Sequence, residues 1–296
     1  MTIETANIKL VAFDLDGTLL DSSKRISASS IHCIDTLKRK GIIVTLITGR
    51  AYYGALPYVD QLDLDSFFSV SDSSLILNRR REFLYESVIP HGATMDAISQ
   101  ASKHGCNVIL VENHNCDDAV IVLKDDLKSW EFSKLLDVEK EVYGFRDEIL
   151  MPVRDFESME SLEPYLMFVF GPRNNISVLE EHFESHFNDR LNLLLKIGLS
   201  SRFHEELYET HGLIIMRPAG SSKAEGFKRI LKHYKVAPRD AMYFGDWYND
   251  VEALNIAGFP VLMGNAPEEI RNGNYHMTGT NDEDGIYDAL KKIMLV

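Results

Sequence analysis

Four short apolar runs in this chain each end in polar residues of the kind that carry out chemistry. Those residues are Asp14 and Asp16, Thr48, Asp246, and Asn265. The runs are rich in strand-forming residues, as expected for buried strands of a parallel sheet. Because the carboxyl ends of parallel strands lie at one edge of a sheet, we expect residues more than 200 positions apart to meet in one crevice.

Lysine and carboxylate groups in one crevice point to a specific kind of reaction. Asp14 and Asp16 are one residue apart, and such like charges need a cation or a shared proton between them. Lys223 follows Ser222, a predicted helix N-cap. An ammonium group in the first turn of a helix opposes the helix dipole, so its presence suggests another purpose, such as binding an anion. Carboxylates, a hydroxyl and a lysine together suit metal-assisted phosphoryl transfer, with Mg²⁺ held by hard oxygen ligands. An isolated Asp-x-Asp-Gly could also be only a strand followed by an Asp-Gly turn, an alternative that the rest of the chain disfavours.

The elements around these residues predict alternating strands and helices. Ser27 can cap a helix that ends at Gly41, and residues 42–47 form a second buried strand. Two successive β-α units imply a right-handed crossover and a parallel sheet. Residues 67–77 predict one or two further short strands.

A long central segment differs from both ends of the chain. Strand-like runs and amphipathic helices alternate there without catalytic-looking strand ends, and residues 214–216 are interpreted as the strand that resumes the earlier pattern. We therefore predict an α/β fold with a Rossmann-like parallel-sheet core, formed by residues 1–86 and 213–296. Residues 87–212 are predicted to form an inserted α+β cap domain.

Composition excludes several classes of partner. The chain has 296 residues, 45% of them hydrophobic, and a net charge of -14, which disfavours nucleic acid and anionic membranes. The N-terminal residues lack the features of a signal peptide, and no apolar run has the length of a transmembrane span. We expect a cytoplasmic protein that is a monomer or a homodimer.

The order of the motifs resembles the haloacid dehalogenase (HAD) superfamily. The motifs are Asp-x-Asp-Gly-Thr at 14–18, Ile-Thr-Gly-Arg at 47–50, Ser-Lys at 222–223 and Gly-Asp-x-x-Asn-Asp at 245–250. The large insertion between the second and third motifs is similar to a C2 cap. Gly-Asn-Ala at 264–266 and the acidic segment at 280–285 resemble the Cof-type branch, subfamily IIB, with a C2B cap.

This resemblance implies roles for individual residues. Asp14 would be the nucleophile that forms an aspartyl-phosphate, and Asp16 the acid that protonates the leaving alcohol and then the base that activates water. The implied Mg²⁺ ligands are Asp14, Asp16 through its backbone carbonyl, and Asp246, with Asp250 nearby or acting through water and Asn249 as an additional candidate. The implied phosphate-binding residues are Thr48, Gly49, Lys223 and Asn265, the last orienting Lys223 or the substrate.

These roles predict a phosphatase that hydrolyses a small phosphorylated metabolite, such as a sugar phosphate, through an aspartyl-phosphate. The alternatives are a phosphomutase and a non-catalytic phosphate-binding regulator, the latter disfavoured because Asp14, Asp16, Lys223 and Asp246 are retained. A mutase needs a second phosphate site on the cap. The cap's arginines are scattered through the sequence, which favours water as the acceptor: Arg146, Arg154, Arg173, Arg190 and Arg202.

Other features carry weaker signals. The chain has Asp72-Ser73-Ser74 where this branch commonly has Asn-Gly-Ala, so a role for that turn cannot be transferred. Trp247 and Tyr248 could line the entrance to the crevice, but we favour packing in the core or a loop. We also predict that no zinc site forms at Cys106, His114 and Cys116. The basic run Arg79–81 could meet an anionic substrate, but we favour a solvated hinge strand. The cap candidates for substrate contact are Arg154, Lys196 and Arg202.

Overall fold

The structure is a computed structural model that describes residues 8–114, 117–143, 147–187, 191–197 and 205–292. Contacts divide the chain into two compact units. The first unit comprises Met1–Gly49, Leu56–Tyr85 and Ser222–Val296. The second comprises Arg50–Ala55 and Glu86–Ser221.

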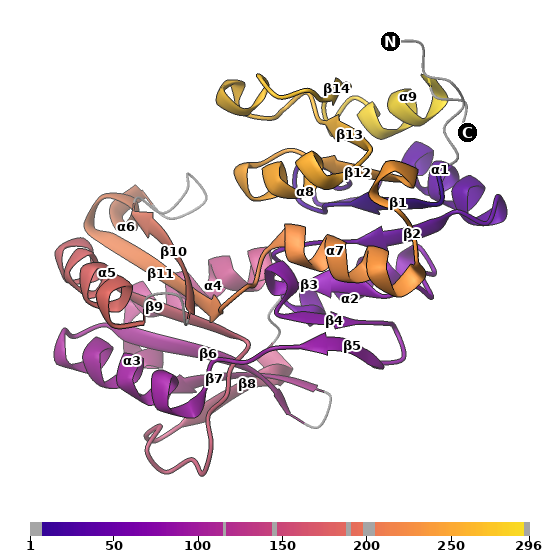
Figure 1. The fold of residues 1–296 in the computed structure, drawn as a ribbon. Coiled ribbons are helices and arrows are strands. Elements are labelled where there is room, and N and C mark those ends of the chain that lie inside the picture. The colour runs from indigo at the N-terminus through magenta and orange to yellow at the C-terminus, as the bar shows by residue number, and fades with distance from the viewer. Residues whose placement is uncertain (1–7, 115–116, 144–146, 188–190, 198–204, 293–296) are drawn as a thin grey trace. The chain divides into compact units, whose positions relative to one another are not determined.

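A parallel sheet forms the centre of the first unit (Figure 1). In the described residues its strand order is β14-β13-β12-β1-β2, and every neighbouring pair is parallel. The strands are β1 (Leu10–Phe13), β2 (Ile43–Leu46), β12 (Ala241–Gly245), β13 (Phe259–Leu262) and β14 (His276–Met277). Strands β1 and β12 are buried along their whole length, which explains their continuous apolar sequences.

Three short strands extend this unit beyond β2. They are β3 (Phe68–Val70), β4 (Leu75–Leu77) and β5 (Phe83–Glu86). An isolated bridge from Ile47 to Ser69 places β3 parallel to the end of β2, and β4 then pairs antiparallel with β3. The 3₁₀ turn η1 (Ser71–Ser73) connects β3 to β4 and is buried.

Helices follow the strands as the sequence predicts. They are α1 (Ala28–Arg39), α2 (Tyr52–Gln61), α7 (Lys223–Tyr234), α8 (Val251–Ile256) and α9 (Gly285–Lys292). The predicted N-caps are confirmed, because Ser27 accepts from the N–H of Ser30 and Ser222 accepts from the N–H of Glu225. Gly41 has a φ of +75°, as a glycine after a helix C-terminus commonly does. Short 3₁₀ turns are η5 (Pro238–Asp240), η6 (Tyr248–Asp250) and η7 (Glu268–Ile270).

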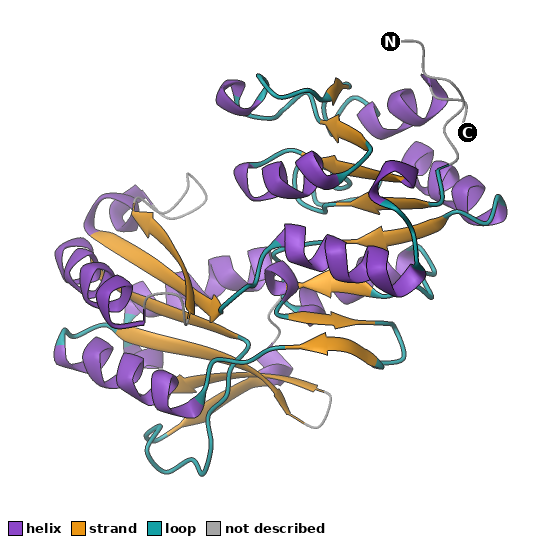
Figure 2. Cartoon of the chain, in the orientation of Figure 1, coloured by secondary structure: helices purple, strands orange, loops and turns teal. Residues whose placement is uncertain are grey.

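The second unit contains a mixed sheet with helices (Figure 2). In the described residues the strand order is β10-β11-β9-β6-β7-β8. The strands are β6 (Asn107–His114), β7 (Asp117–Leu123), β8 (Leu150–Val153), β9 (Leu166–Pro172), β10 (Leu191–Ile197) and β11 (His211–Pro218). The helices are α3 (His91–Lys103), α4 (Trp130–Tyr143), α5 (Arg173–Phe187) and α6 (Glu205–Thr210), with 3₁₀ turns η2 (Asp126–Lys128) and η3 (Asp147–Ile149).

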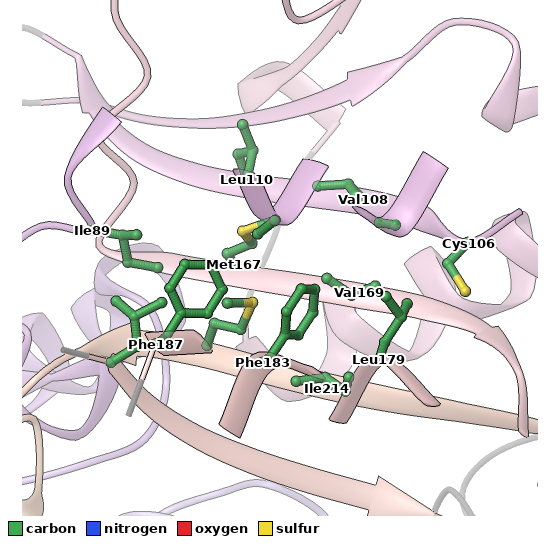
Figure 3. Packing of buried hydrophobic residues seen from close by; sticks show 14 of the residues in the cluster. Ile89, Cys106, Val108, Leu110, Met167, Val169, Leu179, Phe183, Phe187 and Ile214 are labelled. Carbon is green, nitrogen blue, oxygen red and sulfur yellow. The ribbon is translucent and has the colours of Figure 1, made fainter. Parts of the chain in front are cut away.

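Side chains from α3, α5 and one face of this sheet form the second unit's hydrophobic core. Phe183 and Phe187 of α5 are fully buried and face Met167 and Val169 of β9 (Figure 3). The amphipathic pattern of α5 therefore marks its packing face correctly. No helix among the described residues has the length and apolar character needed to cross a membrane.

One strand was assigned to the wrong unit in the sequence analysis. Residues 214–216 were interpreted as the strand that resumes the core, but they lie in β11, which pairs antiparallel with both β9 and β10. The contact boundary is accordingly at residues 221–222. A continuous apolar run fits the middle of either kind of buried sheet, so the sequence pattern does not distinguish them. The predicted α/β class with a parallel-sheet core and an additional sheet region is confirmed.

Candidate active site

Asp14 occupies the carboxyl end of β1 and is buried, with 3% of its surface exposed. Its N–H donates to the carbonyl of Phe244 at 3.0 Å, which fixes the backbone between β1 and β12. Its Oδ1 lies 2.7 Å from Nζ of Lys223. Burial raises the pKa of Asp14 well above its usual value, and Asp250 and Asp246 raise it further, against the lowering effect of Lys223. Burial is therefore the main reason that the charged form of Asp14 is disfavoured.

Lys223 begins α7 and is as deeply buried as Asp14. Its Nζ also donates to Oδ1 of Asp250 at 2.8 Å. Burial alone would lower the pKa of the Lys223 ammonium, but Asp14 and Asp250 raise it above its usual value. The side chain is thus a fixed cation held between two carboxylates, as a phosphate-binding group requires.

Four donors surround the carboxylate of Asp250, which is completely buried. Besides Lys223, the Tyr243 hydroxyl donates to Oδ1 at 2.8 Å, and the N–H groups of Asp246 and Trp247 donate to Oδ2 at 3.2 and 3.1 Å. Asp250 therefore positions both the lysine and the loop that follows β12. The contact of Tyr243 with Asp250 was not predicted, because a tyrosine in an apolar strand indicates only core packing.

Asp246 follows β12 and is held by two side-chain donors. Thr18 Oγ1 donates to Oδ1 at 3.0 Å, and Asn265 Nδ2 donates to Oδ2 at 3.1 Å. Burial, followed by the charge of Asp250, raises the pKa of Asp246 to about 7. Asn265 also donates to the carbonyl of Gly17 at 2.8 Å. Asn265 thus helps to orient Asp246, and the implied role of orienting Lys223 or the substrate stays a prediction.

Carboxylate oxygens of Asp14, Asp246 and Asp250 all lie within 4.8 Å of one another. Buried carboxylate oxygens at such spacing fit a hard divalent cation such as Mg²⁺, which takes oxygen ligands and keeps several waters. The predicted acidic cluster is thus present, and its residues fit Mg²⁺.

Asp16 lies apart from this group, with 31% of its side chain exposed. Its carboxylate contacts the ammonium of Lys24. The carboxylates of Asp14 and Asp16 therefore have different surroundings, although only Leu15 separates them in sequence. Lys24 has no place in the sequence motifs, and only the loop after β1 brings it to Asp16.

The predicted phosphate-binding loop follows β2. Thr48 is buried, and its N–H donates to the carbonyl of Ser69 at 3.0 Å. The N–H of Asp72 donates in turn to the carbonyl of Thr48 at 3.1 Å. Asn249, proposed from sequence as a further metal ligand, donates through Nδ2 to Oδ1 of Asp72 at 3.2 Å. The structure thus places Asn249 against the Asp72 turn.

Comparison with known proteins identifies the family. The model of the haloacid dehalogenase-like hydrolases matches residues 11–290. The chain belongs to this family. Among curated relatives, a 5-amino-6-(5-phospho-D-ribitylamino)uracil phosphatase of Bacillus subtilis is 26% identical over 285 residues, covering 96% of each protein.

Solved structures share the fold of this HAD hydrolase over nearly its whole length. The crystal structure of a haloacid dehalogenase-like hydrolase from Bacteroides thetaiotaomicron has a TM-score of 0.79 and 23% identity, covering 97% of this chain and 99% of that one. A subclass IIB sugar phosphatase has a TM-score of 0.71 and 23% identity, covering 97% and 100%. The predicted membership of the Cof-type HAD phosphatases, which are hydrolases of phosphate esters, is confirmed.

The exposure of two aromatic residues of this HAD hydrolase contradicts the packing role favoured from the sequence. Trp247 and Tyr248 were expected to pack in a core or loop, but 53% and 50% of their surfaces are exposed. The N–H of Trp247 is fixed by Asp250, and the Tyr248 hydroxyl donates to Glu269 at 3.2 Å. The Trp247 ring is therefore largely exposed and packs edge-on against the ring of Tyr248.

The remaining sequence candidates divide into two groups. Arg79 pairs with Asp63 and Asp65 at 2.6 and 3.2 Å on the surface of the first unit. Arg154 is exposed in the second unit. The others concern residues or side chains outside the described part of the chain, so their roles stay predictions: His114, Cys116, Arg146, Arg190, Lys196 and Arg202.

Gly17 lies so close to Asp246 that no side chain fits between them. Its φ is +83°, and an added Cβ would overlap the Asp246 carboxylate. We expect Gly17→Ala to lower the activity of this hydrolase at least about tenfold by displacing Asp246. Phosphate release, measured at several Mg²⁺ concentrations, tests this.

Gly41→Ala is the matched control for that substitution. Gly41 has a similar φ of +75°, but nothing lies within 4 Å of an added Cβ. Both substitutions should therefore cost about 1 kcal/mol of unfolding free energy from backbone strain. Equal activity of the two variants would contradict a tightly packed contact between Gly17 and Asp246.

Proposed function

We propose that this protein is a Mg²⁺-dependent phosphatase that hydrolyses a small phosphorylated metabolite, most specifically a sugar phosphate, through an aspartyl-phosphate on Asp14. The observation that carries the proposal is the buried pair of Asp14 and Lys223, 2.7 Å apart, beside Asp246 and Asp250. A carboxylate nucleophile, a fixed cation and two further carboxylates match the requirements of metal-assisted phosphoryl transfer.

In the first half-reaction an Asp14 oxygen attacks the phosphorus atom. The new Asp14–phosphorus bond forms as the bond between phosphorus and the substrate's alcohol oxygen breaks. Asp16 gives its proton to that oxygen, so the alcohol leaves neutral. Lys24 contacts Oδ1 of Asp16 and so helps to position the carboxyl group that transfers this proton.

In the second half-reaction Asp16 accepts a proton from water. The water oxygen attacks phosphorus, and the Asp14–phosphorus bond breaks to release inorganic phosphate and regenerate the carboxylate. Lys223, held by Asp250, stabilises the charge on the phosphoryl oxygens in both halves. Bound Mg²⁺ would be held by Asp14 and Asp246 and would neutralise phosphoryl charge as it develops.

Small phosphorylated compounds are supported as the substrate class by the relatives. The Bacillus subtilis relative is named for a phosphorylated ribitylaminouracil, and the fold is shared with a sugar phosphatase. Trp247 adds a local feature, because an exposed, positioned indole can stack on a sugar or base ring. Its support is that Trp247 directly follows Asp246 in sequence and that its backbone N–H donates to Asp250.

The identity of the phosphoryl acceptor tests this function. We expect water to be the acceptor, so that a panel of isotope-labelled sugar phosphates yields inorganic phosphate and the free sugar. Phosphorus NMR follows both products directly, and Asp14→Asn protein in the same mixture measures the uncatalysed background. Accumulation of an isomeric sugar phosphate, especially with a bisphosphate primer, would instead establish a phosphomutase.

A further inference from the structure

Tyr243 has a hydroxyl that is buried in an apolar strand and that the reaction described above does not use. It lies in β12 between Met242 and Phe244, and its side chain is fully buried. A phenylalanine would fill the same space without a polar group, whereas a buried hydroxyl costs free energy unless it finds a partner. The partner is Oδ1 of Asp250, to which the hydroxyl donates at 2.8 Å.

The oxygen that Tyr243 contacts is the one that holds Lys223. Nζ of Lys223 donates to the same Oδ1 of Asp250 at 2.8 Å. The other oxygen, Oδ2, accepts from the N–H groups of Asp246 and Trp247 at 3.2 and 3.1 Å. With donors on both oxygens, the carboxylate is held in one orientation. The Tyr243 hydroxyl ties Oδ1 to a strand of the sheet, so the position of this oxygen does not depend on the lysine alone.

The ring of Tyr243 contacts helix α7, which begins with Lys223. It packs edge-on against the ring of Phe227, with the ring centroids 5.2 Å apart and an angle of 64° between the planes. Phe227 follows Lys223 by four residues, so the two buried side chains lie on the same face of α7. Tyr243 therefore restrains the start of α7 through its ring and the lysine ammonium through Asp250.

The contact between Lys223 and Asp250 gains importance during turnover. In the free protein the ammonium contacts Oδ1 of Asp14 at 2.7 Å as well as Asp250. Once the aspartyl-phosphate forms, Asp14 is an ester and no longer a carboxylate, so Asp250 is the remaining one of these two anchors. The lysine stem is flexible, and a displacement of about 1 Å at a reaction centre can lower a rate about a hundredfold.

We propose that Tyr243 is a positioning residue for phosphoryl transfer, which fixes the carboxylate of Asp250 and through it holds the ammonium of Lys223 against the phosphoryl group. This inference rests on the proposed phosphatase function. Tyr243 keeps its proton throughout and acts only by geometry. Loss of its hydroxyl frees Oδ1 of Asp250, while the two backbone contacts to Oδ2 persist.

Tyr243→Phe tests the proposal, because it removes the hydroxyl and keeps the ring that packs on Phe227. Isothermal titration calorimetry with inorganic phosphate in saturating Mg²⁺ should show a dissociation constant at least about fivefold higher than in the wild type, and kcat should fall at least about tenfold. The dissociation constant of Mg²⁺ should change by less than about twofold, because the contacts of Oδ2 keep the loop that carries Asp246 in place.

Tyr234→Phe is the matched control. Tyr234 is the last residue of α7, and its hydroxyl accepts from the N–H of Phe67 at 2.9 Å. This variant also loses one tyrosine hydrogen bond in the same unit, so its melting temperature should fall as that of Tyr243→Phe does. Its phosphate binding and kcat should equal those of the wild type.

A purely structural role for Tyr243 predicts a different pattern, in which Mg²⁺ and phosphate binding weaken together or neither changes. Tyr243→Leu provides a second side chain without a hydroxyl, and thermal unfolding identifies folded variants. Either of those patterns in a folded variant, with a wild type that hydrolyses phosphate esters, overturns this inference alone. A wild type that neither binds phosphate nor hydrolyses any ester overturns the proposed function, and the inference with it.

Discussion

Replacing Asp14 with asparagine is expected to lower phosphate release by more than about a thousandfold while preserving the fold. The amide has nearly the shape of the carboxylate, and its oxygen can still accept from Lys223, which also keeps its 2.8 Å contact with Asp250. It cannot attack phosphorus, however, and it is a much poorer ligand for Mg²⁺. Initial rates of phosphate release, with circular dichroism on the same sample, measure both parts of the expectation.

The melting temperature of this variant tests the effect of the buried Asp14 charge on stability. Because burial raises the pKa of Asp14 well above its usual value, the ionised form is unfavourable in the metal-free protein. The melting temperature of Asp14→Asn without metal should therefore equal or exceed that of the wild type. The exposed Asp35→Asn serves as the control for handling and charge. Turnover within about tenfold of the wild type would rule out Asp14 as the nucleophile.

Removal of divalent cations is expected to lower activity at least about a hundredfold, and added Mg²⁺ should restore it. The physical reason is the buried cluster of Asp14, Asp246 and Asp250, whose mutual repulsion Lys223 only partly offsets. Without a cation, a phosphate dianion would enter a site of the same sign. Phosphate release is measured after dialysis against a chelator and again during titration with Mg²⁺.

Ca²⁺ should suppress the Mg²⁺-supported activity instead of replacing it. Calcium takes more oxygen ligands at longer distances than Mg²⁺, so it would engage the Asp14 carboxylate more fully and hinder its attack. Either cation should raise the melting temperature, because a ligand that binds only the folded state stabilises it. Full activity in excess chelator would contradict the metal assignment.

Sequence patterns predicted the core strands because their signals are local. Strands β1, β2, β12 and β13 are short apolar runs, each followed within three residues by a polar side chain, and the parallel sheet places these strand ends at one edge as expected. The exception is β11, whose apolar sequence suits an antiparallel sheet equally well. Which sheet accepts a buried strand depends on its partners, and no local pattern specifies them.

Site residues outside the motifs were harder to predict because only their tertiary contacts bring them into the site. In the sequence Tyr243 is one of several large residues of an apolar strand. Only the structure shows that its hydroxyl donates to Asp250. Asp72 joins the site through a turn of three left-handed residues, which serine and aspartate do not indicate by type. Trp247 lies inside a recognised motif, yet its exposure depends on how Asp250 holds the loop.

Identifying the residue that carries phosphate during turnover tests the central claim most directly. Sodium borohydride reduces an acyl phosphate to an alcohol, so quenching the working enzyme with borohydride should convert the phosphorylated aspartate to homoserine. Peptide mass spectrometry is then expected to find homoserine at position 14, only when both substrate and Mg²⁺ were present. An unmodified Asp14 in an enzyme that was turning over, or modification at Asp16 in its place, would contradict the account.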